Sequence, residues 1–505
     1  MNRSTSGVVG PALAERLHRP EPRYGWVGVA LAAIAVLMAV ALVLLHRSYP
    51  MHLEVLGLLA SVGVIIALAA TGIGSSSSGR IALLGAAVAV AALGNIVVPF
   101  VLAGRADLSI LVPVLHPTGR DFLEGLYQPG LAFSTARSIW PPFTVVVGWL
   151  FARMPEHSAY SVELAVLTLC AAGSAALSAD LAMAATALQW GQRKESAQKG
   201  LLIFALMLAW TVTSYGFIFA LERGNIDLIA LFFSLLGVWL IVRHPRLMWL
   251  SAFSLAVAVN LKLYPLILLG ILFWRYRWRA VLPAVVSTVV LFSAAGLTNA
   301  RFSVQNLIGG GGAGPYLWVG NQSAASYASI LHDAFGLDPV WTGWLLLLAT
   351  MGIWAWTMVV LVRRGFSASR AVLAAAAAVP VMGILPSTSH DYKLVLLVLP
   401  LAVLVAVVAK AEFRSSISTT ALLGLTTLAL VVSARSTLLM APQVVANKLP
   451  ILFVIQGLIL AVVLLRAKAA NDTSGVDERE AGRCPPRNHL DVPAEAVDRS
   501  SGGSL

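Results

Sequence analysis

The feature that most constrains this chain is a long series of apolar runs of about 20 residues each. A hydrocarbon core about 30 Å thick is crossed by roughly 20 residues of helix, and a helix satisfies its own backbone hydrogen bonds there. The runs fall near 25–46, 53–73, 81–104, 140–155, 160–188, 200–221, 226–243, 278–297, 339–362, 369–386, 392–410, 418–435 and 450–466. Only 11% of the 505 residues are charged, too few to cover a soluble protein of this length. We therefore predict an all-α polytopic membrane protein with roughly 13–14 crossings.

One apolar stretch, 248–275, is interrupted by Asn260, Lys262 and Pro265. Proline breaks a helix and frees backbone groups near it. Irregular backbone survives at membrane depth only where it is buried in protein or lines a cavity. The pattern predicts that 260–265 is a cavity element.

The basic residues mostly flank the apolar runs, so the net charge of +12 indicates membrane orientation rather than binding to nucleic acid. Clusters expected on the cytoplasmic side are Arg3 to Arg23, Arg243 with Arg246, Arg275 to Arg279, Arg363 with Arg364, Lys410 with Arg414, and Arg466 with Lys468. The opposite side then holds 105–139, 222–227, 298–338, 386–393 and 436–449. The cations at 193–199 fit this pattern only if 140–155 or 160–188 is re-entrant or a short hairpin.

The expected organisation is a cytoplasmic segment over 1–24, a transmembrane catalytic domain over 25–468 and a disordered cytoplasmic tail over 469–505. No signal-peptide pattern opens the chain. Cys170 lies in an apolar run and Cys484 in a polar tail, so no disulfide is expected.

Ionisable residues at membrane depth are candidates for function, and here they gather on the predicted outer side. Asp121 and Glu124 are three residues apart, which would place them on one face of a helix. A carboxylate beside a basic residue can act as a general base. The alternative is a solvated loop with ordinary charges.

Two further segments combine polar groups with apolar surroundings. Glu222, Arg223, Asn225 and Asp227 lie at the junction of two apolar runs, where they either line a substrate cavity or form an interfacial turn. Lys262 lies among apolar residues, so it must reach an interface, pair with an acid or bind an anion such as a lipid phosphate.

Two late loops complete the candidates. The 298–338 loop contains Gly309–Gly312 and then Asn321; no Lys-Ser/Thr follows the glycines, so a P-loop is excluded. His390, Asp391 and Lys393 follow the run that ends at Pro386, where they suit contact with a phosphate or a sugar. No second histidine lies at ligand spacing, so we expect no metal site and no cofactor.

These motifs together resemble glycosyltransferase family 87, the polyprenyl-phosphate-dependent mannosyltransferases. The similar elements are Gly224–Asp227, then Leu261–Pro265, an Asp121 loop followed by Trp140-Pro141-Pro142, and Ser389–Asp391 before an apolar run ending at Pro400. The resemblance covers roughly 105–410. Within it the motifs follow the same order as in the family and lie on the same predicted side of the membrane.

The resemblance implies a GT-C fold in the plasma membrane, an extracytoplasmic active site and an inverting sugar transfer with an α-linked product. The donor would be a polyprenyl-phosphate sugar, most often mannose, and the acceptor a glycolipid or polysaccharide. It implies Asp121 as the base and Lys262, His390 and Arg223 as ligands of the donor phosphate. Other substrate contacts would come from Glu124, Asn225, Asp227, Asn321, Asp391 and Lys393.

Alternatives remain open from the residues. Arabinofuranose is an alternative donor sugar. A secondary transporter also keeps buried ions and broken helices, but usually near the membrane midplane. In a membrane O-acyltransferase or a polymer ligase, His390 would be the base.

Overall fold

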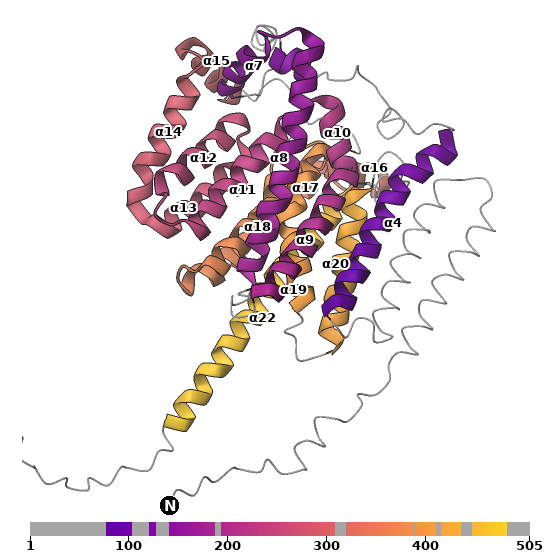
Figure 1. Ribbon diagram of the computed structural model, residues 1–505, viewed down its shortest axis with the longest axis vertical. Coiled ribbons are helices and arrows are strands. Elements are labelled where there is room, and N and C mark those ends of the chain that lie inside the picture. Colours follow the sequence, from indigo (N-terminus) through magenta and orange to yellow (C-terminus); the bar gives the residue numbers. More distant parts are fainter. Residues whose placement is uncertain are drawn as a thin grey trace, which may run out of the picture.

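The computed structural model describes residues 77–103, 121–127, 141–186, 193–308, 320–386, 389–410, 416–435 and 447–481. Within these ranges the chain is helical, with one isolated β-bridge between Asn321 and His390 (Figure 1). The helices are α4 (Ser77–Ala103), η2 (Asp121–Tyr127), α7 (Phe143–Phe151), α8 (Glu156–Ala185), α9 (Arg193–Thr213), α10 (Tyr215–Arg223), α11 (Asp227–Arg243), α12 (Met248–Leu261), η4 (Tyr264–Leu268), α13 (Leu269–Tyr276), η5 (Arg277–Ala280), α14 (Val281–Ser293), α15 (Leu297–Ile308), α16 (Ala324–Phe335), α17 (Pro339–Arg363), α18 (Ala368–Ile384), η7 (Asp391–Leu397), α19 (Val398–Lys410), α20 (Ser416–Ala434) and α22 (Leu449–Ala481).

Four helical segments of the described residues are long and apolar enough to cross a membrane, namely Glu156–Ala185, Pro339–Arg363, Asp391–Lys410 and Leu449–Ala467. The number rises to six if each of two bent pairs is one span, Ala197–Thr213 with Tyr215–Arg223 and Tyr264–Ser293 with Leu297–Gln305. This confirms an all-helical protein built to span a membrane. The predicted runs 25–46 and 53–73 lie outside the described residues.

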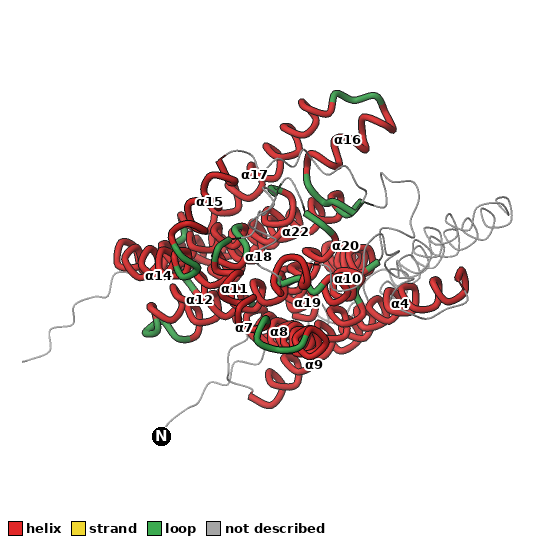
Figure 2. The backbone as a smooth tube through the Cα atoms, turned by 90° about the horizontal axis from the view of Figure 1, so that it is seen from above, coloured by secondary structure: helices red, strands yellow, loops and turns green. Residues whose placement is uncertain are grey.

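The centre of the bundle is α19, which is apolar all round and buried along its most hydrophobic stretch. It packs against α8, α18, α9, α4 and α20. Seen from above, these helices surround it (Figure 2). A helix without a polar face is stable only when it is enclosed, so this segment positions the loops at both of its ends.

The hydrogen bonds of the cations define one end of the bundle, here called the basic end (Arg80, Arg364, Lys410, Arg466). Lys410 Nζ donates to Thr186 O at 2.7 Å and Arg466 Nη1 donates to Ala185 O at 2.6 Å. Two more such bonds join Arg80 Nη2 to Ala409 O at 3.1 Å and Arg364 Nη2 to Ala467 O at 2.6 Å. Three of the predicted basic clusters, those of Arg364, Lys410 and Arg466, therefore meet at one end, and Arg80, which belongs to no predicted cluster, lies with them.

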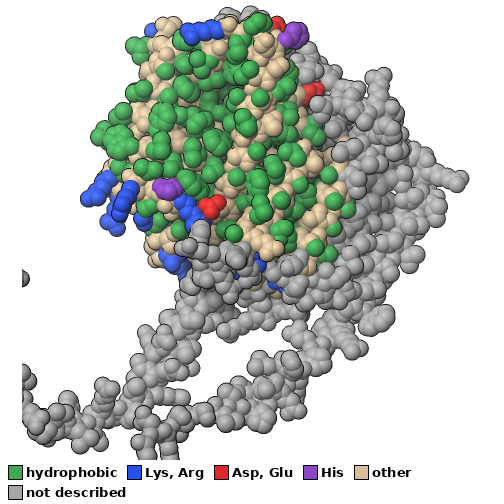
Figure 3. Space-filling model, viewed as in Figure 1, with side chains coloured by type: hydrophobic (Ala, Val, Ile, Leu, Met, Phe, Trp, Pro, Cys, Tyr) green, Lys and Arg blue, Asp and Glu red, His purple; other side chains and the backbone are tan. Residues whose placement is uncertain are grey.

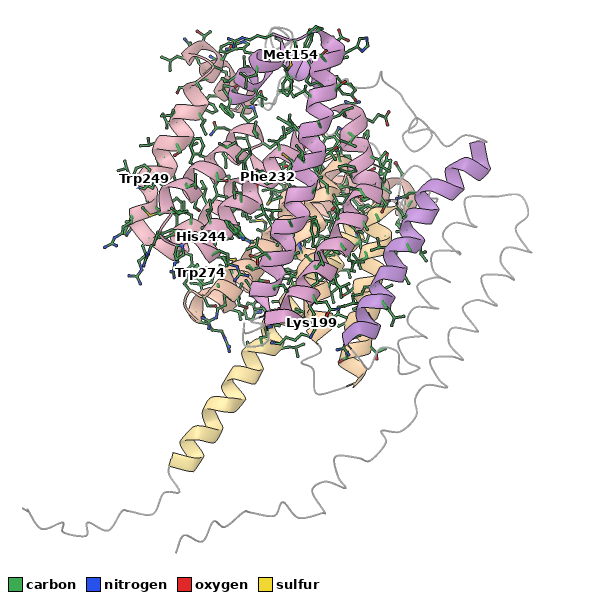
Figure 4. The ribbon with its side chains drawn as sticks, in the orientation of Figure 1. Met154, Lys199, Phe232, His244, Trp249 and Trp274 are labelled. Atoms are coloured by element: carbon green, nitrogen blue, oxygen red, sulfur yellow. The ribbon has the colours of Figure 1, made fainter. Side chains whose placement is uncertain are left out.

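The path of 140–199 is resolved by the length of α7. Its nine residues extend about 14 Å at 1.5 Å per residue, half of what a crossing needs. It packs against η2, where a Cβ on Gly148 would lie 2.0 Å from Leu126 O. Of the two segments considered, 140–155 is therefore the one that does not cross, and α8 alone spans the bundle. Met154 and Lys199 lie at opposite ends (Figure 4).

The interruption predicted at 260–265 is present. α12 ends at Leu261, Lys262 has extended backbone (φ −148°, ψ 135°), and the 3-10 helix η4 follows with Pro265 near its start. At the C-terminus, α22 continues to Ala481, so the predicted tail begins within this helix. Its remainder from 482 lies outside the described residues.

Candidate active site

The end of the bundle opposite the basic end, here called the polar end, brings together segments far apart in the sequence. They are the α10–α11 turn (222–227), the segment before α16 (320–323), the segment before η7 (389–391) and the start of α22 (447–448). α10 reaches this end because Ser214 bends the α9–α10 pair by 55°. α10 then lies tightly on η7: a Cβ on Gly216 would lie 2.8 Å from Asp391 O.

The α10–α11 turn fixes Asp227 at the first turn of α11. Gly224 adopts a left-handed conformation (φ 62°) and ends α10. Asn225 Oδ1 then accepts a hydrogen bond from Asp227 N at 3.0 Å. A carboxylate in the first helical turn is stabilised by the helix dipole, so this short motif both turns the chain and orients a buried acid.

Asp227 is the centre of a buried charged network. Tyr264 Oη donates to its Oδ1 at 2.5 Å, and Lys262 Nζ lies 3.4 Å from its Oδ2. The Asp227 side chain is fully buried and that of Lys262 is 12% exposed. Lys393 Nζ lies 5.4 Å from the Tyr264 ring centroid and within electrostatic reach of both Asp227 and Lys262.

This network explains why a lysine can lie among apolar residues. Burying a lone ammonium is costly, and an acid partner offsets much of that cost. Two ammonium groups, those of Lys262 and Lys393, therefore lie near the Asp227 carboxylate.

A second network ties His390 in place. Asn321 Oδ1 accepts hydrogen bonds from Ser389 N at 2.7 Å and from Ser323 N at 3.2 Å. Gln322 N donates to Ser389 O at 2.6 Å, and Gln322 Nε2 donates to Asp391 Oδ1. Asn321 and Gln322 therefore hold the residues on both sides of His390, Ser389 through its backbone and Asp391 through its side chain.

The start of α22 closes this network from a third direction. Asn447 Nδ2 donates to Asn321 O at 2.9 Å, and Lys448 N donates to Gln322 Oε1 at 2.6 Å. Asn321 and Asp391, predicted to contact substrate, are therefore engaged with the protein itself. The sequence interpretation gave no role to Tyr264, Gln322 or Asn447, since only their tertiary partners distinguish them from other polar residues.

The His390 ring is partly buried and lies 5.5 Å from the Tyr392 ring, centroid to centroid. His390 is the N-cap residue of η7 and Lys393 follows within the same helix. This turn therefore links the two networks, because it places Lys393 beside Tyr264 and His390 beside Asn321.

The first predicted acid lies on η2, a π-helix that begins at Asp121. The side chains of Asp121 and Glu124 lie outside what the structure describes, as does Trp140. The next residue, Phe122, lies close to Gly224: a Cβ added to Gly224 would be 2.6 Å from the Cβ of Phe122. The backbone at 121–122 is thus in contact with the α10–α11 turn, which brings Asp121 to the polar end.

Acidic groups flank this contact. Glu163 and Glu222 are 0% and 6% exposed, and Tyr160 Oη donates to Leu221 O at 3.0 Å. Arg223 is within electrostatic reach of Glu222. Arg223 therefore lies on the side of the site that contains carboxylates, whereas Lys262 and Lys393 lie around Asp227.

The surface next to Lys262 is apolar and open. Leu263 is 38% and Leu266 56% exposed. A small cavity near Gln322, Ser389 and Lys393 has room for roughly one water molecule. Among the described residues no group of three or more His, Cys, Asp or Glu side chains is placed to hold a metal ion. The glycine run 309–312 lies outside these residues.

The described residues thus form an all-helical membrane protein with buried cations at one end, beside an exposed apolar surface. The family model of glycosyltransferase family 87 matches residues 139–388, about half of the chain. The chain belongs to glycosyltransferase family 87 and is a membrane glycosyltransferase. No curated protein and no solved structure shows significant similarity to it.

Proposed function

We propose that this glycosyltransferase moves a sugar from a polyprenyl-phosphate donor to a glycolipid or polysaccharide acceptor at the outer face of the plasma membrane. The sugar we propose is mannose. The observation that carries the proposal is Lys262. It is a cation at a break in a membrane-depth segment, paired with Asp227 and adjacent to exposed Leu263 and Leu266. A phosphate attached to a lipid can reach this cation while its tail stays in the bilayer.

The proposed chemistry is a single displacement. An acceptor hydroxyl attacks the anomeric carbon, the bond from that carbon to the phosphate oxygen breaks, and polyprenyl phosphate leaves with the electron pair. The hydroxyl proton passes to Asp121. Inversion at the anomeric carbon then gives an α-linked product from a β-linked donor.

The cations would stabilise the leaving phosphate. Lys262, Lys393 and His390 would contact the phosphate oxygen on which negative charge develops, and Arg223 would approach it from the side of Glu222. Asp227 and Tyr264 would hold Lys262 in place. A cation that is already in position stabilises the transition state more than one that must reorient. Glu124 and Asn225 stay proposed acceptor contacts.

The outer-face assignment is supported by charge. The basic end, with Arg364, Lys410 and Arg466, carries the cations expected in the cytoplasm. The polar end then faces the opposite side, where nucleotide sugars are absent and a membrane carrier supplies the sugar.

The test is sugar transfer in membranes that contain the full chain, given radiolabelled polyprenyl-phosphate mannose. We expect a labelled product with the wild-type protein, and none with Asp121→Asn or His390→Ala. Parallel reactions with polyprenyl-phosphate arabinofuranose identify the sugar. Transport of label across sealed vesicles without a new glycosidic bond would instead favour a transporter. Acyl transfer lost only in His390→Ala would favour the acyltransferase alternative.

A further inference from the structure

The turn between α13 and α14 contains a strained residue. Arg277 has φ 53° and ψ −138°, and it is the only non-glycine residue with positive φ within the described ranges. A bulky side chain is disfavoured in this region of backbone space. Such strain persists when surrounding contacts hold the residue, and it often marks a functional position.

Contacts on both sides hold this turn. Tyr276 Oη donates to Pro245 O at 2.9 Å, which attaches the turn to the α11–α12 connection. Arg275 Cζ lies 4.6 Å from the Phe366 ring centroid, and the Trp274 ring lies 5.3 Å from the same centroid. The turn is thus anchored to two neighbouring connections of the basic end, and its strained shape is a fixed feature.

The anchored turn presents cations and an indole to the outside. Arg275, Arg277 and Arg279 are all exposed, and Trp278 is 87% exposed. The adjoining connections add exposed Arg246 and Arg363. In the space-filling view, one group of basic side chains lies at the lower left edge of a largely apolar face (Figure 3).

The nearby described acid does not neutralise this group. Asp180 Oδ2 accepts hydrogen bonds from Arg243 Nε and from Trp239 Nε1, both at 2.8 Å. Its charge is therefore matched by Arg243. The five exposed arginines around the turn keep a surplus of positive charge.

Membrane orientation alone does not account for this arrangement, because the positive-inside rule needs charges but no particular backbone shape. We propose that the 275–279 turn, with Arg246 and Arg363, binds the phosphate headgroup of an anionic glycerophospholipid. Guanidinium groups bind phosphate in a bidentate manner, and anionic lipids attract such clusters.

A lipid suits this surface better than a soluble anion. Besides Trp278, the neighbouring Leu247 and Trp249 are 45% and 54% exposed. His244 and Trp274, labelled with Trp249 on the same flank in Figure 4, continue this aromatic region. Indole rings favour the headgroup level of a bilayer, so phosphate and acyl chain would both find matching groups.

Native mass spectrometry of the full chain in detergent tests the site, with phosphatidylglycerol or phosphatidylcholine titrated in. We expect tighter binding of phosphatidylglycerol. Arg277→Gln with Arg279→Gln should weaken it about 25-fold, at roughly fivefold per arginine. The matched control is Arg153→Gln with Arg301→Gln, exposed arginines outside the basic end. Equal loss in both double variants, or no preference between the lipids, would overturn the site.

A second variant separates binding from folding. Arg277→Gly relieves the backbone strain, so the melting temperature should rise while phosphatidylglycerol binding falls. A fall in both would mean that Arg277 is structural and would contradict the proposal. Glycerol phosphate without acyl chains is the remaining arm: competition by it at equal concentration would show that a soluble phosphate, not a lipid, is the ligand.

Discussion

The two ends of the bundle hold charge in different ways. At the basic end, Lys410 and Arg466 bond the carbonyl groups of the C-cap residue and the last residue of α8, where cations complement a helix terminus. At the polar end, Lys262 is buried against Asp227, and that pair is joined by Tyr264. The cations at the basic end thus bond backbone carbonyl groups at a helix terminus, whereas Lys262 at the polar end is paired with a buried side-chain carboxylate.

The largest effect that would sharpen this contrast concerns Asp121. Asp121→Asn keeps the shape of the side chain and removes its basicity, so transfer should fall by about 10²–10⁴-fold. Protein level and donor binding should persist. The measurement is product formation at saturating donor and acceptor.

Glu124→Gln is the matched control, since it lies one turn further on the same short helix. Its loss should be much smaller. Near-normal turnover in Asp121→Asn together with inactivity of Glu124→Gln would exchange the two roles.

The next effect separates charge pairing from donor binding. Lys262→Met alone leaves the buried Asp227 without its closest counter-charge, which should destabilise the protein by at most about 3–5 kcal/mol, because Lys393 stays nearby. Adding Asp227→Asn removes that penalty. We expect the double variant to recover the melting temperature and to stay defective in donor binding.

Recovery of activity along with stability in that double variant would show that Lys262 serves folding alone. Lys262→Arg, which keeps the charge, should retain part of the activity. The three proteins are compared by thermal unfolding and by binding of polyprenyl phosphate.

A smaller, pH-dependent effect concerns Gln322. Gln322→Glu places a second carboxylate against Asp391, so the Ser389–Asp391 segment should be displaced when both are ionised. Lowering the pH lets the pair share one proton and restores the hydrogen bond. Relative activity should therefore rise toward acidic pH compared with wild type.

Gln322→Met, which cannot titrate, is the control for this profile. It should lose activity by a similar factor at every pH. Parallel profiles of Gln322→Glu and Gln322→Met would mean that Gln322 does not act through Asp391.

The last prediction tests the orientation of the two ends by thiol labelling alone. In a chain with Cys170→Ser and Cys484→Ser, Arg153→Cys should react with an impermeant thiol reagent in intact cells. Arg279→Cys should react only after permeabilisation. The reverse pattern would invert the proposed orientation.

Much of the candidate site could be predicted from local sequence. The Asn225–Asp227 turn depends on neighbouring residues, and the break at Lys262 follows from Pro265 nearby. The bond between Gln322 and Asp391 could not be predicted, because it joins residues 69 positions apart. Local sequence also could not show that α7 packs against η2 instead of crossing the membrane. Nothing local distinguishes a short apolar helix from part of a membrane-spanning one.

The sequence by itself determined that the chain is helical, enters a membrane and gathers cations at one end, because hydropathy and charge act residue by residue. Tertiary structure decided which helix lies at the centre. α17 and the Asp391–Lys410 segment have similar mean hydropathy, 2.2 and 2.6, yet 17% and 100% of their most apolar windows are buried. Lipid and protein interior are equally apolar, so hydropathy alone cannot choose between them, and packing between helices does.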